Sequence, residues 1–109
     1  MSKLKEYKMY INGLWVDAEG KKTFKSLNPE NNEPWAIVPE ASEKDTNKAV
    51  EAAHKAFEGE WSKLFPRDRA KFLRAIAEQL RENAEHLGKI ETVDTGKLFR
   101  ETKTQATYI

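Results

Sequence analysis

The segment Ile90–Lys97, which reads IETVDTGK, places two carboxylates near a predicted helix end. Glu91 and Asp94 are three residues apart and share one helix face, so the pair could act as a general acid and base. Gly96 predicts the end of the helix, because glycine adopts the left-handed conformation there without a steric penalty. Asp94 is then unfavourably placed, since the negative pole of a helix opposes a carboxylate by about 0.3–1 kcal/mol. Without a substrate cleft in view, two surface carboxylates are the simpler interpretation.

Other residues that could do chemistry are few. The 109 residues contain no cysteine, which excludes disulfides, cysteine-rich zinc sites and a thiol nucleophile carried by this chain. His54 and His86 stand alone on predicted helices and are interpreted as packing or surface residues. No glycine-rich phosphate loop and no His-Glu-x-x-His pair is present.

The charge balance argues against two classes of partner. There are 19 basic and 18 acidic residues, with no segregated basic block. Binding to a nucleic acid or to an anionic membrane would need a clustered basic patch, so neither partner is expected. No apolar run reaches the length of a bilayer-spanning helix or a signal peptide. A soluble, cytoplasmic protein is therefore expected.

Turn signals and alternation predict the first elements that must position the helix end. Asn12-Gly13 is the dipeptide that best accepts the two positive φ angles of a type I′ hairpin turn. A polar turn rich in Asn and Pro separates two later strands. The expected strands lie near residues 8–11, 14–17, 23–27 and 35–38. Large aromatic side chains are expected to anchor these strands and a later connector to the core: Trp15, Trp35 and Trp61.

Helical periodicity dominates the rest of the chain. Ser42 and Asp45 form a capping-box pattern that begins a helix, and Gly59 ends it. Pro66 opens a second helix at the position where its missing amide costs nothing. A third helix is expected over about 83–95, and the final segment LFRETKTQATYI is again helical in pattern. The second helix carries a stripe that is expected to be buried: Phe72, Leu73, Ile76, Ala77 and Leu80.

These elements predict an α/β fold class, or α+β for the piece taken alone. Residues 1–41 form the hairpin and short strands, and residues 42–109 form a helical segment. The chain stops at Ile109 in mid-pattern, without a glycine, a cap or a charged tail. Natural termini rarely stop in this way, so the 109 residues are expected to be the beginning of a longer protein.

Four pieces of sequence occur in a characteristic order and spacing: INGLWV, NPENNEP, AVEAAHKAF and ETVDTGK. No single piece is specific, but the combination resembles the N-terminal region of the NAD(P)-dependent aldehyde dehydrogenase superfamily along nearly the whole chain. The closest resemblance is to the branch that contains betaine aldehyde dehydrogenases and similar broad-range enzymes.

The resemblance implies an enzyme that oxidises an aldehyde to a carboxylic acid with NAD or NADP as hydride acceptor. In such enzymes a cysteine thiolate captures the aldehyde, hydride passes to the nicotinamide, and a glutamate assists hydrolysis of the thioester. These residues and the dinucleotide-binding units belong to later parts of the family's chains, so no catalytic or cofactor-binding residue is assigned here. This chain is then a scaffold part of the nucleotide-binding domain and is predicted to be inactive alone.

The implied partners are the remainder of the enzyme, a small-molecule aldehyde and further subunits of a homodimer or homotetramer. A different class of function also remains open. The chain could be a free-standing structural or interaction module that kept this framework and lost the enzyme.

The resemblance also implies a role for Asp94 at the helix end. In the family the matching aspartate helps to hold a monovalent cation, K⁺ or Na⁺, together with backbone oxygens that correspond to Ser26 and Leu27. Leu27 could serve only through its carbonyl, and Ser26 through its carbonyl or hydroxyl. The penalty at the helix end would then become an attraction. Two alternatives stay open: Asp94 pairs with Lys97, or it accepts a hydrogen bond from a nearby amide.

Overall fold

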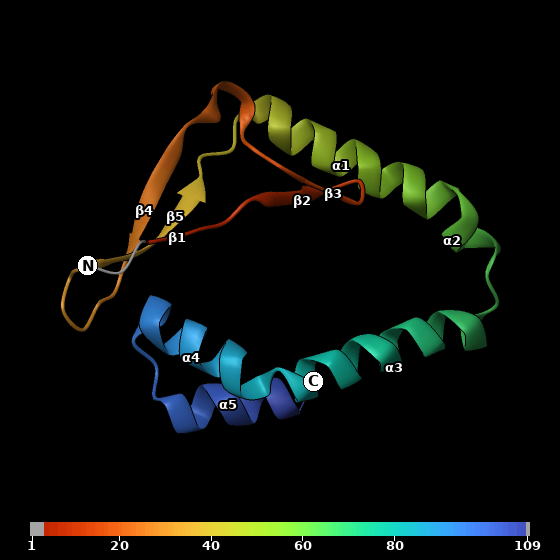
Figure 1. Cartoon of the computed structure of the whole chain (residues 1–109). Helices are drawn as coiled ribbons and strands as arrows, with labels where there is room; N and C mark the ends of the chain where they lie inside the picture. The colour runs from red at the N-terminus through yellow and green to blue at the C-terminus, as the bar shows by residue number, and fades with distance from the viewer. Residues whose placement is uncertain (1–3, 109) are drawn as a thin grey trace. The chain divides into compact units, whose positions relative to one another are not determined.

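The computed structural model describes residues 4–108, in which short strands are followed by helices (Figure 1). Contacts divide the chain into two compact units. The first contains the residues up to Ser26 together with Pro34–Leu64, and the second contains Leu27–Glu33 together with the residues from Phe65 onward. The predicted α/β class is confirmed. The predicted division between residues 41 and 42 stays a prediction, although the contacts group the first long helix with the strands.

Five short strands are present: β1 (Lys5–Glu6), β2 (Met9–Ile11), β3 (Leu14–Val16), β4 (Thr23–Leu27) and β5 (Pro34–Pro39). The predicted hairpin is confirmed, since β2 pairs with β3 in antiparallel register. Asn12 (φ 52°) and Gly13 (φ 78°) have the positive φ angles that a type I′ turn requires. The strands predicted near 23–27 and 35–38 are also confirmed, as β4 and β5.

A three-stranded sheet has the order β1-β5-β4, with β1 parallel to β5. Ala36 lies opposite Lys5 in this pairing and is fully buried in the central strand. The hydrogen bond from the Tyr7 amide to the Ile37 carbonyl, 2.9 Å long, continues the pairing. Sequence patterns did not predict β1, because two exposed residues carry no alternation.

Helix α1 (Glu43–Glu58) begins with the predicted capping box. Ser42 Oγ accepts a hydrogen bond from the Asp45 amide at 3.2 Å, and Asp45 Oδ2 accepts one from the Ser42 amide at 2.9 Å. Asp45 Oδ2 also accepts from the Glu19 amide at 3.0 Å, which fastens the short 3₁₀ turn η1 (Glu19–Lys21) to the start of the helix. These amide donors hold the pKa of the buried Asp45 carboxyl below its usual range.

The connector expected after Gly59 is partly helical, because it contains the single turn α2 (Glu60–Lys63). The second unit contains the remaining helices: α3 (Pro66–Glu82), α4 (Ala84–Thr95) and α5 (Phe99–Thr107). Pro66 occupies the first turn of α3, as predicted. The helices predicted at 83–95 and in the final segment are confirmed by α4 and α5.

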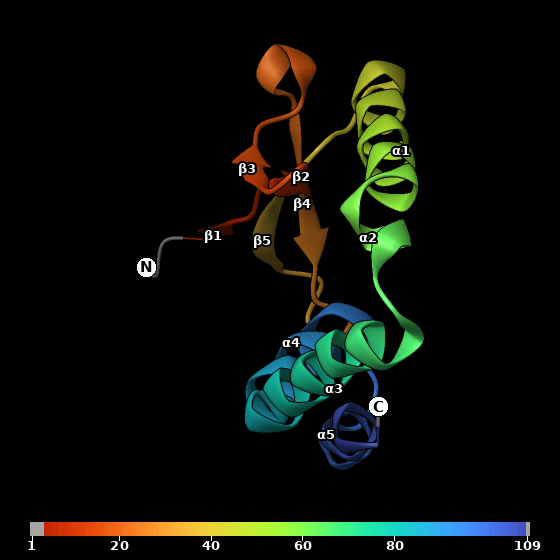
Figure 2. The same cartoon turned by 90° about the vertical axis from the view of Figure 1, so that its right-hand side faces the viewer.

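Helices α4 and α5 lie side by side in both views (Figures 1 and 2). Their contact is closest at Gly88, where a Cβ atom would lie 2.9 Å from the Lys103 nitrogen. Thr102 is fully buried beside it, and its hydroxyl lies 2.9 Å from the Gly88 carbonyl oxygen, to which it donates. A glycine and a small polar side chain therefore allow the two backbones to approach closely.

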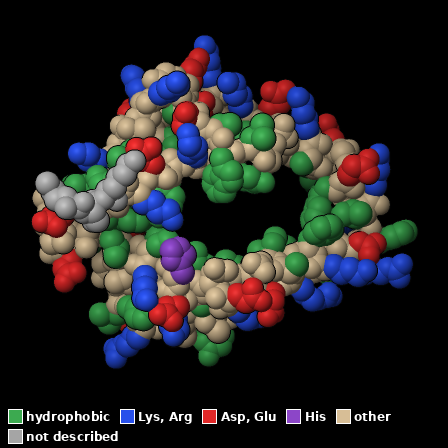
Figure 3. All heavy atoms as spheres, in the orientation of Figure 1, with side chains coloured by type: hydrophobic (Ala, Val, Ile, Leu, Met, Phe, Trp, Pro, Cys, Tyr) green, Lys and Arg blue, Asp and Glu red, His purple; other side chains and the backbone are tan. Residues whose placement is uncertain are grey.

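The buried hydrophobic side chains of the described residues are three alanines: Ala18, Ala36 and Ala84. The stripe predicted to be buried on α3 is instead largely exposed, at 55% for Phe72, 62% for Leu73 and 56% for Ile76. The rest of the stripe is half-buried: Ala77 and Leu80. Figure 3 shows hydrophobic side chains along this helix. Periodicity identifies the apolar face of α3 but does not supply a layer that covers it, and no such layer is present within residues 4–108. The exposure agrees with the expectation that this face packs against a larger sheet that the chain itself does not contain.

The tryptophans also differ from expectation. Trp15 is 69% exposed and contacts Tyr10 across the hairpin, with ring centroids 4.9 Å apart. Trp61 is 39% exposed. Trp35 is half-buried and packs edge to face with Tyr7 at 6.0 Å. The expectation that all three anchor a core was therefore wrong for Trp15 and Trp61, because aromatic type alone does not show whether a ring is covered.

Candidate functional site

The C-terminal end of α4 is the part of the structure in which the predicted site lies. Asp94 is exposed in the last turn of this helix, which contains no basic residue. Gly96 has φ 78°, and its amide donates to the Thr92 carbonyl at 2.9 Å. The predicted glycine stop is confirmed. The Asp94 carboxylate and the last carbonyl oxygens of α4 therefore add negative charge at the same pole.

The turn that follows β4 lies against this helix end (Figure 2). The turn is closed by the Asn28 amide, which donates to the Glu33 carbonyl at 2.9 Å, and Asn28 Oδ1 accepts from the Glu30 amide at 3.0 Å. A Cβ atom on Gly96 would lie 3.1 Å from Pro29 Cγ. The segment directly after Leu27 is therefore in contact with the end of α4, within one compact unit.

Ser26 and Leu27 are the last two residues of β4. Ser26 is half-buried, and Leu27 is 46% exposed. Leu27 belongs to the same compact unit as Asp94, whereas Ser26 belongs to the other unit. The assignment of Ser26, Leu27 and Asp94 to one cation site stays a prediction.

The second carboxylate near this helix end is engaged by a lysine. Lys97 Nζ lies 2.6 Å from Glu91 Oε1. The Glu91 carbonyl accepts a hydrogen bond from Thr95 Oγ1 at 2.7 Å. The ion pair favours a structural role for Glu91 over the acid–base pair with Asp94 that the sequence suggested.

The available donors determine which ion this end of α4 could hold. Within residues 4–108 no group of three or more His, Cys, Asp or Glu side chains could hold a metal ion. Structural zinc sites are built mainly from nitrogen and sulfur ligands. One carboxylate with carbonyl and hydroxyl oxygens is instead an oxygen set of low charge, which fits a hard monovalent cation.

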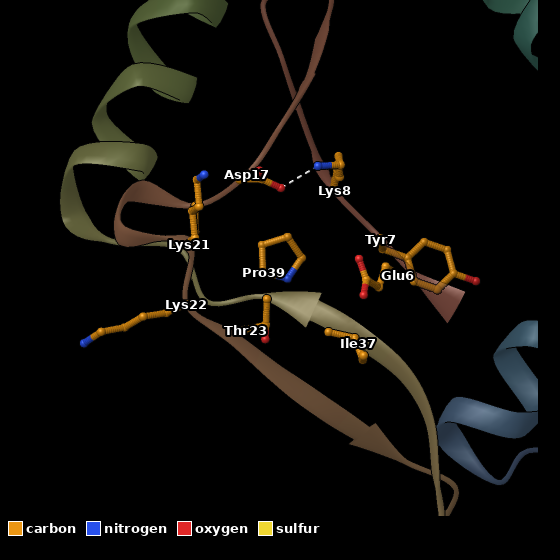
Figure 4. A pocket seen from close by; sticks show the side chains of 10 residues that line it. Glu6, Tyr7, Lys8, Asp17, Lys21, Lys22, Thr23, Ile37 and Pro39 are labelled. Atoms are coloured by element: carbon orange, nitrogen blue, oxygen red, sulfur yellow. Dashed lines mark hydrogen bonds and ion pairs between the residues drawn. The ribbon is translucent and has the colours of Figure 1, made fainter. Parts of the chain in front are cut away.

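A separate hollow of about 170 Å³ lies in the first unit (Figure 4). Lys8 and Asp17 face each other on its wall, with Nζ 2.6 Å from Oδ1. They flank the paired residues Met9 and Val16, so the ion pair extends the hairpin by one cross-strand contact. The Lys8 ammonium holds the pKa of the Asp17 carboxyl below its usual range. Sequence reasoning did not single out this pair, which the hairpin register alone could have suggested.

The remaining sequence candidates lie on the surface. His54 Nε2 lies 3.3 Å from Glu58 Oε1 one helical turn later, and the His54 side chain is 66% exposed. His86 is also exposed. Basic and acidic side chains are intermixed on the face shown in Figure 3. None of the described helices has the length and apolar character needed to cross a bilayer.

Comparisons with known proteins agree with this architecture. The model of the aldehyde dehydrogenase family matches residues 15–109. The chain is 40% identical over 107 residues to a (Z)-2-((N-methylformamido)methylene)-5-hydroxybutyrolactone dehydrogenase of Acinetobacter baylyi, which covers 97% of this chain and 22% of the relative. It is 41% identical over 96 residues to a betaine aldehyde dehydrogenase of Bacillus subtilis, which covers 87% of this chain and 20% of the relative.

Solved structures give the same result. A betaine aldehyde dehydrogenase from Staphylococcus aureus in complex with NAD⁺ matches with a TM-score of 0.86 and 40% identity, over 91% of this chain and 20% of that chain. An NAD-dependent aldehyde dehydrogenase from Sinorhizobium meliloti matches with a TM-score of 0.92 and 30% identity. The match covers 97% of this chain and 22% of that chain. The chain spans about a fifth of the length of these relatives. The chain therefore belongs to the aldehyde dehydrogenase family.

Proposed function

We propose that the chain is the N-terminal part of an enzyme that oxidises an aldehyde to a carboxylic acid, with NAD⁺ or NADP⁺ as hydride acceptor. The observation that carries this proposal is the agreement in sequence and fold, over 91% of the chain, with a betaine aldehyde dehydrogenase in complex with NAD⁺. A quaternary ammonium aldehyde such as betaine aldehyde is the first substrate to test. A cytoplasmic homodimer or homotetramer is the proposed assembly.

In this enzyme the chain contributes framework rather than reacting groups. It contains no cysteine, so the thiol that captures the aldehyde comes from another part of the enzyme. The exposed apolar face of α3, with Phe72 and Ile76, is proposed to pack against that other part. The bound nicotinamide would accept the hydride, and no described residue of this chain is assigned to hold it.

The activity test compares two proteins. The isolated 109-residue chain should show no aldehyde-dependent reduction of NAD⁺ or NADP⁺, whereas the complete protein encoded by the gene should show it. The DNA after Ile109 should continue into a glycine-rich strand-turn-helix unit and a cysteine codon. A stop codon directly after Ile109 would contradict the proposal and favour a free-standing structural or interaction module.

We also propose that Asp94 binds K⁺ or Na⁺ together with oxygens of Ser26 and Leu27. The contact between Pro29 and Gly96 supports this proposal, because it brings the turn after Leu27 to the end of α4. When bound, the ion supplies positive charge at the negative pole of the helix.

The test of the cation site is the thermal stability of the complete protein in K⁺, Na⁺ and N-methylglucamine at equal ionic strength. Binding predicts ion-specific stabilisation that Asp94→Ala loses. Glu85→Ala is the matched control, because Glu85 is a carboxylate on the same helix, in its first turn. Equal melting temperatures in all three salts would identify Asp94 as an ordinary surface residue.

A further inference from the structure

We propose that Asn12 is a site of spontaneous deamidation and that the β2–β3 hairpin controls the rate of this reaction, which occurs only while the hairpin is open. Asparagine is among the thermolabile residues. Asn12 is followed by Gly13, and both residues are exposed in the turn between the two strands. The reaction needs no part of the proposed catalytic machinery, because water is its only co-reactant.

The chemistry begins at the main-chain nitrogen of Gly13, which attacks Cγ of Asn12. A bond forms between these two atoms, and the bond from Cγ to Nδ2 breaks. Nδ2 leaves as ammonia and takes the proton of the Gly13 N–H with it, so that a five-membered succinimide ring remains. Water then opens the ring at one of its two carbonyl carbons, which leaves either aspartate or isoaspartate at position 12. No atom is oxidised or reduced.

Asn12 is the asparagine best suited to this reaction among the described residues. Gly13 has no side chain to hinder its nitrogen, and a Cβ atom placed on it would have no atom within 4 Å. Within residues 4–108 no hydrogen bond holds the Asn12 side chain. Asn28 precedes a proline, whose nitrogen carries no proton. Two others are held by hydrogen bonds, since Asn31 Oδ1 accepts from a backbone amide at 3.0 Å and Asn83 Nδ2 donates to a carbonyl of α3 at 2.8 Å.

The closed hairpin keeps the reacting atoms apart. Ring closure requires Cβ of Asn12 and the nitrogen of Gly13 to be eclipsed about the bond between Cα and the carbonyl carbon of Asn12. The φ angles of 52° and 78° belong to a type I′ turn, and the first central residue of such a turn has ψ of about +30°. At this angle the two atoms lie on nearly opposite sides of the bond. The hairpin must therefore open before the ring can form.

Two cross-strand contacts oppose this opening. The rings of Tyr10 and Trp15 have centroids 4.9 Å apart, and Lys8 Nζ lies 2.6 Å from Asp17 Oδ1. Both contacts lie at the surface, with Trp15 69% exposed, so each stabilises the hairpin only moderately. A two-stranded hairpin is marginally stable by itself, and local opening is therefore expected.

The reaction changes the hairpin permanently when it gives isoaspartate. The main chain then runs through the former side chain of Asn12, which adds one carbon atom to the two-residue loop. Loop length and turn type set the register of a hairpin, so the type I′ turn and the pairing of Tyr10 with Trp15 cannot form again.

The test follows the complete protein over time at mildly alkaline pH, by proteolytic digestion and mass spectrometry, with chromatography to separate aspartate from isoaspartate. A synthetic peptide of residues 8–17 gives the rate for an open chain. Asn12 should be deamidated more slowly in the protein than in the peptide, but faster than Asn31 or Asn83 of the same protein. Equal rates in protein and peptide would show that the hairpin has no control. If the peptide reacts completely while Asn12 of the protein yields no product, Asn12 is not a deamidation site.

Trp15→Ala tests the role of hairpin opening. Loss of the aromatic pair should raise the rate at Asn12 of the protein about two- to tenfold, because such a pair contributes a free energy that corresponds to this factor. The same substitution in the peptide should leave the rate unchanged. Phe24→Ala is the matched control, because it removes a 51% exposed aromatic ring from β4, which belongs to the other sheet. The proposal is wrong if Trp15→Ala gives no acceleration, if Phe24→Ala gives the same acceleration, or if the rate at Asn31 rises equally, since the reaction would then follow global unfolding.

Discussion

The N-terminal end of α1 and the C-terminal end of α4 each carry an aspartate, but the backbone groups near the two carboxylates have opposite polarity. Asp45 is 5% exposed and accepts hydrogen bonds from the amides of Ser42 and Glu19. Asp94 is exposed at a pole whose carbonyl oxygens repel it. The comparison teaches that a carboxylate at a helix N-terminus is satisfied by nearby amides, whereas one at a C-terminus needs positive charge from outside its own helix.

The largest expected effect comes from the residue that shapes the α4 end. Gly96→Ala places a Cβ in a left-handed backbone conformation and 3.1 Å from Pro29 Cγ. The conformational penalty alone should lower the free energy of unfolding by about 1–2 kcal/mol. Chemical denaturation of the complete protein measures the loss.

Gly13→Ala is the control, because Gly13 has the same φ of 78° but no atom within 4 Å of the added Cβ. The excess loss in Gly96→Ala over Gly13→Ala reports the contact with the turn. An equal loss in the free energy of unfolding for the two variants would show that Pro29 moves away from the added Cβ at no cost, and that its contact does not hold the turn against α4.

The next effect concerns the α1 end. Asp45→Asn should lower the melting temperature at neutral pH by a few degrees, the range typical for loss of a helix cap. The folded state lowers the pKa of Asp45 below its ordinary value of 3.8, so its stabilising effect is fully present above that value. It is lost as the pH falls through the lowered pKa.

Thermal unfolding between pH 7 and pH 2 tests this expectation. The difference between native and Asp45→Asn proteins should be constant near neutrality and should shrink below about pH 4. A difference that persists unchanged at pH 2 would mean that the shape of the side chain, and not its charge, fastens η1 to α1.

A smaller effect that depends on the salt is expected at Asp94. In N-methylglucamine alone, Asp94→Ala should lower the melting temperature less than it does in K⁺, because the carboxylate at the negative pole of α4 gains most when a bound cation offsets that charge. In K⁺ the same variant should be less stable than the native protein. A destabilisation of the same size in both salts would place Asp94 with Asp45, as a residue held by ordinary hydrogen bonds.

The smallest effect is expected at Glu85, in the first turn of the helix that ends near Asp94. The ammonium of Lys89, 2.8 Å away, lowers the pKa of Glu85 by hydrogen bonding and charge. Both side chains are 62% exposed, so Glu85→Gln should change the melting temperature only slightly. The change should disappear in about 0.5 M salt, because salt screens the interaction between exposed charges. A large, salt-independent loss would show that α4 depends on its N-terminal acid as α1 depends on Asp45.

Sequence determined the features whose partners are close along the chain. The turn at Asn12-Gly13, the capping box of Ser42 with Asp45 and the stop at Gly96 were predicted and are present. Each depends on backbone angles or donors within a few residues, so residue types alone specify it. The prediction that Asp94 lies at the C-terminal end of a helix, near its last carbonyl oxygens, also needed only local information.

Tertiary structure decided the contacts between distant segments. The Asp45 carboxylate also binds the Glu19 amide, 26 residues away, and Pro29 lies against Gly96. No local pattern encodes these pairs, because they depend on how the chain returns on itself. The exposure of Phe72 was likewise beyond periodicity, since a helix stripe shows which face is apolar but only packing decides whether another layer covers it.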